Sequence, residues 1–212
     1  MNVSRFTFNM FGVNTYILWD NISKEAMIID PGMVDDKERK IIDDFIEGNS
    51  LDMRYLVNTH MHIDHSFGVS YIMQKYGLKL ACNKSDQFLA ERLMEQARMF
   101  GLTLSISDLV INVEFNDGDK LSIGGETLHI MHVPGHSPGS IVIYAPESSF
   151  LISGDVLFNS SIGRSDLPGG NYKQLVNAIR EKLMTLPDDT IIYPGHGSET
   201  NIEKEKMSNP YV

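Results

Sequence analysis

The sequence has one cysteine, Cys82, among its 212 residues. A single cysteine excludes a disulfide within the chain. Cys82 lies in the apolar run LKLACN, so we expect a buried and unreactive thiol. The sequence also has no G-x-S-x-G motif, and covalent catalysis by cysteine or serine is therefore unsupported.

Long apolar runs are absent. No run approaches the roughly 20 residues that a membrane span needs. The opening stretch, MNVSRFTFNMFGVNTYILWD, lacks the basic start and the continuous apolar core of a signal peptide. The sequence therefore predicts no membrane partner and a cytoplasmic location.

Positive charge is scarce. Lys and Arg total 18 against 28 Asp and Glu, which gives a formal net charge of −10. An acidic surface repels phosphate backbones, and the basic residues are scattered among acids, as in DDKERK and IEKEKM. We expect a small-molecule substrate and no nucleic acid, while the oligomeric state stays open.

Linkers, low-complexity tracts and repeats are also absent, so the prediction is one domain spanning residues 1–212. Strands and helices alternate in both halves of the chain. Strands are expected at 4–9, 14–20, 25–30, 53–59, 78–82, 120–124, 126–133, 140–146, 149–158 and 190–196. Helices are expected at 34–48, 66–77, 85–101 and 171–186, with a short polar helix in the tail. This mixture predicts an α/β (α+β) protein in which two mixed sheets carry helices on their outer faces.

Histidine is crowded into the stretch VNTHMHIDHSFG, residues 57–68. In extended backbone, residues two apart point the same way, so His60 and His62 share one side while Met61 faces the opposite side. Asp64 and His65 follow where the chain turns into a helix. Single histidines are usually independent core or surface residues, but four candidate ligands in six positions disfavour that interpretation. The cluster predicts a site for zinc, iron or manganese, with room for a second ion.

Two ions need more donors, and three occur downstream, each just after an expected strand. His136 lies in VPGHSPGS, Asp155 in FLISGDVLF and His196 in IIYPGHG. Glycine and proline beside these residues favour tight, rigid loops. Ligands delivered from strand ends onto one edge of a sheet suit a rigid metal site.

These motifs together resemble the metallo-β-lactamase superfamily. They are T-H-x-H-x-D-H at residues 59–65, P-G-H-S-P-G around His136, S-G-D around Asp155 and P-G-H-G around His196. Within that superfamily the chain most resembles the short, single-domain glyoxalase II-like hydrolases. The stretch LFNSSIGRSDLPGGN also resembles a segment of those hydrolases and of the persulfide dioxygenases.

The resemblance implies a four-layer αββα sandwich, the metallo-β-lactamase fold, and a ligand set for two divalent ions. The first ion would be held by His60, His62 and His136, and the second by Asp64, His65 and His196, with Asp155 bridging both. Asp30, in IIDPG, matches a position that supports the metal loop. The chain ends about sixteen residues after His196, without the helical region with which two-domain glyoxalase II enzymes hold glutathione.

The expected activity is hydrolysis of a thioester, such as an S-hydroxyacylglutathione-like substrate, by a metal-bound hydroxide. Asp64 and Asp155 are the expected catalytic residues, and zinc is the first choice of metal, with iron or manganese compatible. A mononuclear-iron persulfide dioxygenase and a lactonase remain alternatives, and a catalytically silent metal-binding module is disfavoured because no ligand position is missing.

Two further residues are singled out with open roles. Arg164 could pair with a carboxylate of the substrate, or form a structural ion pair with nearby Asp166. His132 is expected to support the loop that carries His136. The methionines from Met94 to Met99 fall at helical spacing and are expected in the core.

Overall fold

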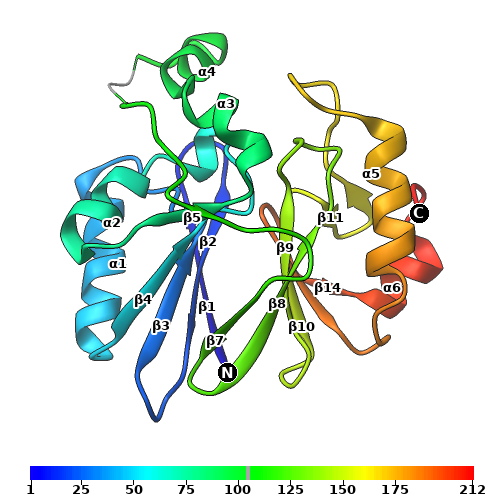
Figure 1. Ribbon diagram of the computed structural model, residues 1–212, viewed down its shortest axis with the longest axis horizontal. Helices are drawn as coiled ribbons and strands as arrows, with labels where there is room; N and C mark the ends of the chain where they lie inside the picture. The colour runs from blue at the N-terminus through cyan, green and yellow to red at the C-terminus, as the bar shows by residue number, and fades with distance from the viewer. Residues whose placement is uncertain (104–105) are drawn as a thin grey trace.

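The computed structural model describes residues 1–103 and 106–212 (Figure 1). The first half of the chain contributes one sheet and four helices. They are β1 (Asn2–Phe8), β2 (Val13–Trp19), β3 (Glu25–Ile29), α1 (Asp36–Gly48), β4 (Asp52–Val57), α2 (Val69–Tyr76), β5 (Leu80–Cys82), α3 (Gln87–Ala90), α4 (Leu93–Met99) and β6 (Val113–Glu114). The strand order is β1-β2-β3-β4-β5-β6, antiparallel from β1 to β3 and parallel from β3 to β6.

The second half contributes the other large sheet, a two-stranded ribbon and two helices. They are β7 (Lys120–Ile123), β8 (Glu126–His132), β9 (Ile141–Ala145), β10 (Phe150–Gly154), β11 (Leu157–Phe158), β12 (Ser161–Ile162), α5 (Tyr172–Ala178), β13 (Ile191–Pro194), β14 (Thr200–Asn201) and α6 (Ile202–Ser208). The large sheet has the order β14-β13-β10-β9-β8-β7, and β11 pairs with β12.

Three apolar layers hold these elements together. Strand β2 shows why, since both faces of it are buried: Ile17 packs toward the helices of the first half, whereas Tyr16 and Leu18 pack between the two sheets. A third cluster, which includes Leu151 and Leu175, lies between the second sheet and helices α5 and α6. The order helix, sheet, sheet, helix confirms the predicted four-layer αββα sandwich (Figure 1).

Helix α1 illustrates how local sequence sets the outer layer. The Asp35 side chain caps its first turn by accepting hydrogen bonds from the amides of Lys37 and Glu38, and Ile42 and Ile46, four residues apart, are its buried positions. The expected helix at 34–48 is therefore confirmed within two residues of its start.

Several expected elements were wrong in extent. The helix expected at 85–101 is broken between α3 and α4, where the carbonyl of Ala90 accepts a hydrogen bond from the distant Leu109 amide at 2.8 Å. The strand expected at 149–158 ends at Gly154, and the chain turns at Asp155 before β11. The helix expected at 171–186 changes from α5 to a π-helical turn at Ile179–Leu183.

Met99 was expected in the core, but its exposed fraction is 61%.

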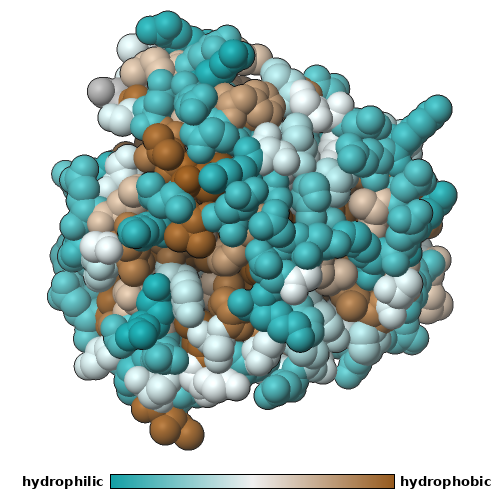
Figure 2. All heavy atoms as spheres, in the orientation of Figure 1, coloured by the Kyte–Doolittle hydropathy of each residue, from teal (hydrophilic) through white to brown (hydrophobic). Residues whose placement is uncertain are grey.

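The expected burial of Cys82 is confirmed, since its side chain is fully enclosed and burial raises the pKa of its thiol well above the usual value. Among the described residues, no helix is both long and apolar enough to cross a membrane. On the face drawn in Figure 2 hydrophilic side chains predominate, and a larger hydrophobic area lies between α4 and β5.

Candidate metal centre

The seven predicted ligands all follow the ends of strands. His60 and His62 come after β4, and a short 3-10 turn, Ile63–His65, carries Asp64 and His65. His136 lies between β8 and β9, Asp155 follows β10 and His196 follows β13. Met61 is fully buried, as the alternation in the sequence predicted, and Ile63 is fully buried as well, so both anchor the loop from behind.

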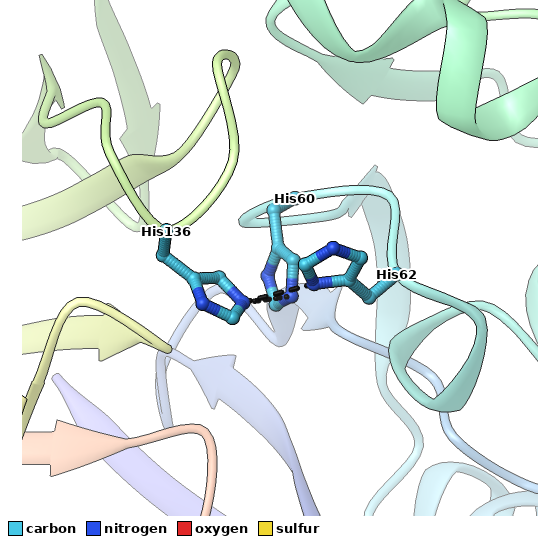
Figure 3. Close-up of side chains that lie close together, drawn as sticks. All are labelled: His60, His62 and His136. Carbon is cyan, nitrogen blue, oxygen red and sulfur yellow. Dashed lines mark hydrogen bonds between the residues drawn. The ribbon is translucent and has the colours of Figure 1, made fainter. Parts of the chain in front are cut away.

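The first group consists of three buried imidazoles, His60, His62 and His136, whose ring nitrogens converge (Figure 3). His136 Nε2 lies 2.9 Å from His62 Nδ1 and 3.1 Å from His60 Nε2. His60 and His62 come from one loop and His136 from the facing loop of the second sheet (Figure 3). This arrangement can hold one metal ion with nitrogen ligands only.

The second group consists of Asp64, His65 and His196. His196 Nε2 lies 3.2 Å from Asp64 Oδ2 and 3.3 Å from His65 Nε2. His65 Nε2 lies 3.7 Å from the same Asp64 oxygen. This group can hold a second ion with two nitrogens and one oxygen.

Asp155 lies between the two groups. Its Oδ1 is 3.4 Å from His65 Nε2, and its Oδ2 is 3.6 Å from His136 Nε2 and 3.5 Å from His196 Nε2. Oδ1 is buried without a hydrogen-bond partner in the described chain. A buried carboxylate oxygen without a donor is costly, and it fits a position where a cation is bound.

Hydrogen bonds on the far side of three rings determine which nitrogen faces the cluster. The Nδ1 of His136 donates to the carbonyl oxygen of Arg164 at 2.7 Å, and that of His196 donates to the carbonyl oxygen of Phe11 at 3.1 Å. The Nδ1 of His65 donates to Asp30 Oδ2 at 3.0 Å. Because each acceptor requires a proton on Nδ1, Nε2 is the nitrogen of each ring that is left to bind a metal ion. The donor set therefore fits divalent ions that prefer nitrogen and oxygen ligands, such as zinc, iron or manganese.

The charges differ between the two groups. Burial, together with neighbouring histidines, lowers the pKa of His60 well below its usual value, and burial and His136 lower that of His62 to about 3. Burial also opposes protonation of His65, but the carboxylates of Asp155, Asp64 and Asp30 outweigh it and raise the pKa of that ring. His60 and His62 are thus held neutral, whereas the second group attracts positive charge.

The two carboxylates of the cluster are held ionised. Burial alone would raise the pKa of Asp155, but the charges of His65, His136 and His196 outweigh it and lower that pKa. The pKa of Asp64 is lowered against burial in the same way, chiefly by His65 and His196. Two carboxylates are therefore available to cations at neutral pH.

Asp30 lies behind the loop. Its Oδ1 accepts from the Thr59 amide at 2.7 Å, and its Oδ2 accepts from the Thr59 hydroxyl at 2.7 Å and from His65 Nδ1. Asp30 also lies close enough to His60 and His65 for the three residues to form a further group of potential metal ligands. Because both oxygens already accept hydrogen bonds, its contacts are those of a support for the loop.

Asp86 was not identified from the sequence. This buried residue follows β5, and its Oδ2 accepts from the Met61 amide at 3.0 Å and from Ser137 Oγ at 2.7 Å. Its Oδ1 accepts from the Gly139 amide at 2.6 Å. One carboxylate thus joins the His60–His62 loop to the His136 loop. The available signal was its position a few residues after a buried strand, where the other acidic residues of the site also occur.

His132 and Arg164 lie beside the cluster in different ways. His132 Nε2 is 2.8 Å from the carbonyl oxygen of Pro138, two residues beyond His136, so it contacts the predicted loop. The Arg164 side chain forms the ion pair with Asp166 that the sequence left open, at 2.8 and 2.7 Å, and both side chains are exposed. Arg164 also lines the cavity above the cluster.

Two glycines allow the close approach of the loops. Gly154 has φ +50°, and a Cβ there would overlap the side chain of Thr59. A Cβ at Gly195 would overlap Asp155 Oδ1 and lie 2.8 Å from His65 Cε1. Any other residue at either position would displace a member of the cluster or its support.

Comparisons with known proteins point to one superfamily. A family model for the metallo-beta-lactamase superfamily matches residues 9–196. The hydroxyacylglutathione hydrolase GloC of Haemophilus influenzae is 41% identical over 214 residues, covering 100% of this chain and 98% of the relative. The human mitochondrial persulfide dioxygenase ETHE1 is 30% identical, covering 92% of this chain and 70% of that protein.

Solved structures with similar folds cover nearly the whole chain. The BLEG-1 B3 metallo-β-lactamase superposes with a TM-score of 0.88 at 31% identity, covering 99% of both chains. The protein TTHA1623, solved in a di-iron-bound form, superposes with a TM-score of 0.86 at 31% identity and covers 99% of this chain and 100% of its own.

Proposed function

This chain belongs to the metallo-β-lactamase superfamily, and on that premise we propose that it is a dinuclear metallohydrolase that cleaves a thioester of the S-hydroxyacylglutathione kind. The observation that carries the proposal is the position of Asp155 between two groups of ligands, with one oxygen toward His65 and the other toward His136 and His196. A carboxylate in that position can bridge two ions.

The proposed ligand set has seven members. One ion would be held by His60, His62 and His136, the other by Asp64, His65 and His196, and both by Asp155. Bound divalent ions would supply a water of lowered pKa and a Lewis acid for the carbonyl oxygen. Zinc is our first choice of metal, and the di-iron form of the similar TTHA1623 makes iron a direct competitor.

The residues of the chain have separate tasks in this reaction. The oxygen of water attacks the carbonyl carbon, the carbon–sulfur bond breaks, and a carboxylic acid and a thiol result. Asp64 is held ionised and lines the cavity above the cluster, where its carboxylate can accept a hydrogen bond from the attacking water and orient it. The hydrogen bonds on His65, His136 and His196 fix their rings, so the geometry needs no rearrangement during the reaction.

Support of the site by Asp30 and His132, and a substrate contact by Arg164, belong to the same proposal. Arg164 lines the cavity, and its ion pair with Asp166 is solvent-exposed and therefore weak, so a substrate carboxylate can compete for the guanidinium.

Metal analysis and a hydrolysis assay test the proposal together. Protein purified without chelator should contain close to two metal ions per chain and should hydrolyse S-lactoylglutathione, with activity lost to a chelator and restored by metal. One ion per chain, unchanged by added metal, would rule out the dinuclear centre. Full metal loading without hydrolysis of any thioester would rule out the substrate class.

A persulfide dioxygenase is the second candidate, because the human enzyme is 30% identical over most of this chain. Oxygen uptake with glutathione persulfide, in protein that leaves thioesters intact, would favour it. Lactonase or β-lactamase activity is a further alternative, the latter because BLEG-1 has the same fold. A panel containing a thioester, a persulfide, a lactone and a β-lactam compares these classes directly.

A further inference from the structure

The cavity above the cluster has one apolar wall. Its volume is about 330 Å³, and its floor is formed by members of the cluster, among them Asp64 and His196. The remaining lining residues are almost all apolar: Phe11, Phe100, Phe158, Leu167 and the side chain of Arg164. Nothing in the proposed hydrolysis uses the three phenylalanines.

These aromatic rings come from three separate segments. Phe11 lies in the turn between β1 and β2, Phe100 directly follows α4, and Phe158 ends β11. Phe11 and Phe100 meet edge to face, with ring centroids 5.4 Å apart and planes at 74°. Phe158 approaches His196 with centroids 6.3 Å apart. Phe100 remains 41% exposed, although it is a large apolar residue, so its ring has surface free for a ligand.

A small side chamber of about 30 Å³ extends this wall. Among its lining residues His62, Phe100 and Leu167 are shared with the main cavity. The others are Leu89, Met99, Pro168 and Gln96. The amide of Gln96 is already used, since it donates to the carbonyl oxygens of Met61 and Leu89 and accepts from the Ile63 amide. Apart from the His62 ring, whose Nε2 has no hydrogen-bond partner among the described residues, the chamber therefore offers apolar contact.

Fixed positive charge is scarce around the cavity. Arg164 is the one lysine or arginine among the lining residues that the structure describes, and Asp166 already pairs with it. The cavity is thus poorly suited to select a substrate through several carboxylates, and selection must come from shape and apolar contact.

We infer that the wall formed by Phe11, Phe100 and Leu167 is an acyl-binding subsite that selects an apolar, aromatic acyl group over a small one. The inference rests on the proposed thioester hydrolysis and adds the class of acyl group. With the carbonyl at the cluster, the group attached to it lies against the wall, where a phenyl ring leaves water and contacts Phe100. A methyl group in the same position leaves most of that apolar surface exposed to water.

A matched pair of substrates isolates the effect. S-mandeloylglutathione and S-lactoylglutathione share the thiol and the α-hydroxyl and differ only in phenyl against methyl. We expect kcat/KM at least about tenfold higher for the mandeloyl thioester. Phe100→Ala should lower kcat/KM for the mandeloyl thioester about tenfold, mainly by raising KM, and should leave kcat/KM for the lactoyl thioester within about twofold. Phe100→Leu should retain most of the preference for the mandeloyl thioester. Tyr211→Ala, a control whose side chain is also 41% exposed but lines no described cavity, should change neither.

Binding of the product acids tests the subsite apart from turnover. By calorimetry on the metal-loaded protein, mandelate should bind at least about tenfold more tightly than lactate, and Phe100→Ala should remove the difference. If neither thioester is hydrolysed but mandelate keeps its advantage, the thioesterase proposal fails and the apolar subsite stands. Equal binding of the two acids, a lactoyl preference in turnover, or an equal loss for both substrates in Phe100→Ala would overturn the inference.

Discussion

Replacing Asp86 with alanine should weaken the fold and the first metal group together. The carboxylate accepts three hydrogen bonds, from Met61 N, Ser137 Oγ and Gly139 N, and it is buried. Met61 lies between His60 and His62, and Ser137 and Gly139 follow His136. All three imidazoles of the first group are therefore positioned through this one side chain.

The magnitude follows from the donors left behind. Each buried donor without an acceptor costs about 1–3 kcal/mol, so three would cost roughly 3–9 kcal/mol if nothing relaxed. Two effects reduce this. Ser137 Oγ also lies 2.8 Å from Ser140 Oγ, so this hydroxyl can turn to Ser140 instead. Removing the carboxylate also removes the cost of burying its charge, the burial that raises the pKa of Asp86. We expect a net loss of about 2–4 kcal/mol in the free energy of unfolding.

Asp86→Asn separates hydrogen bonding from volume. Its amide oxygen can still accept from Met61 and Ser137, but its NH₂ group then faces the Gly139 amide, a donor against a donor. The loss should be about 1–2 kcal/mol, between those of alanine and the wild type. Asp189→Ala, at an exposed aspartate, serves as the control.

Urea unfolding of the metal-free protein gives the stability, and competition with a chromophoric chelator gives the metal affinity. Loss of such a supporting residue typically weakens metal affinity about 10- to 100-fold. If Asp86→Ala stayed within about 0.5 kcal/mol of the wild type and bound metal normally, the carboxylate would not be what connects the two loops.

The remaining predictions concern the bridge, protonation and an ion pair away from the site. Asp155→Asn keeps the shape but removes a negative charge between two cations, so metal content should fall toward one ion and turnover by orders of magnitude; two retained ions with near-normal turnover would contradict this. Metal binding should weaken from pH 8 to pH 6, and more for the second ion than for the first, because the pKa of His65 is raised while those of His60 and His62 are lowered; equal pH dependence in zinc titrations would oppose this. Asp43→Asn should lower the free energy of unfolding by about 1 kcal/mol at pH 7. Burial opposes ionisation of Asp43, but Lys75, Tyr71 and Tyr76 outweigh it and lower the pKa of the carboxyl group. The stabilisation by Asp43 is therefore full above the pKa of the unfolded state and is lost as the pH falls through the pKa of the folded state. Urea unfolding of both proteins at pH 7 and pH 3 should therefore show a smaller difference at the lower pH.

The sequence was most informative where one residue type had to recur at short spacing. The stretch from His60 to His65 can be recognised from the sequence because its donors are neighbours in the chain. His136, Asp155 and His196 can be recognised because each lies beside glycine or proline. The strands of both sheets could be predicted for a related reason. Contacts that bury alternate residues recur along each strand and leave a repeating pattern in the sequence.

The sequence was least informative where the local structure involves hydrogen bonds between residues far apart in the chain. The break between α3 and α4 has no glycine or proline to mark it, and the 2.8 Å bond from Leu109 N to Ala90 O joins residues nineteen apart. Asp86 is similar, because its three partners lie 25 to 53 residues away. Neither contact leaves a periodic pattern, so neither could be found before the fold was known.

The contacts of Asp86 join the two halves of the chain, and other hydrogen bonds at the edge where the two sheets meet do the same. There the Ile141 amide donates to the carbonyl oxygen of Thr59 at 2.9 Å, and the Asn14 amide donates to that of Gly195 at 2.7 Å. The side chain of Asn14 also donates to the carbonyl oxygens of Pro194 and Gly197, which flank His196. The first group takes two histidines from one sheet and one from the other, and the second group is divided in the same way. A shift of one sheet against the other would therefore open both groups at once, and the buried hydrogen bonds along this edge hold the geometry of the site as well as the packing of the fold.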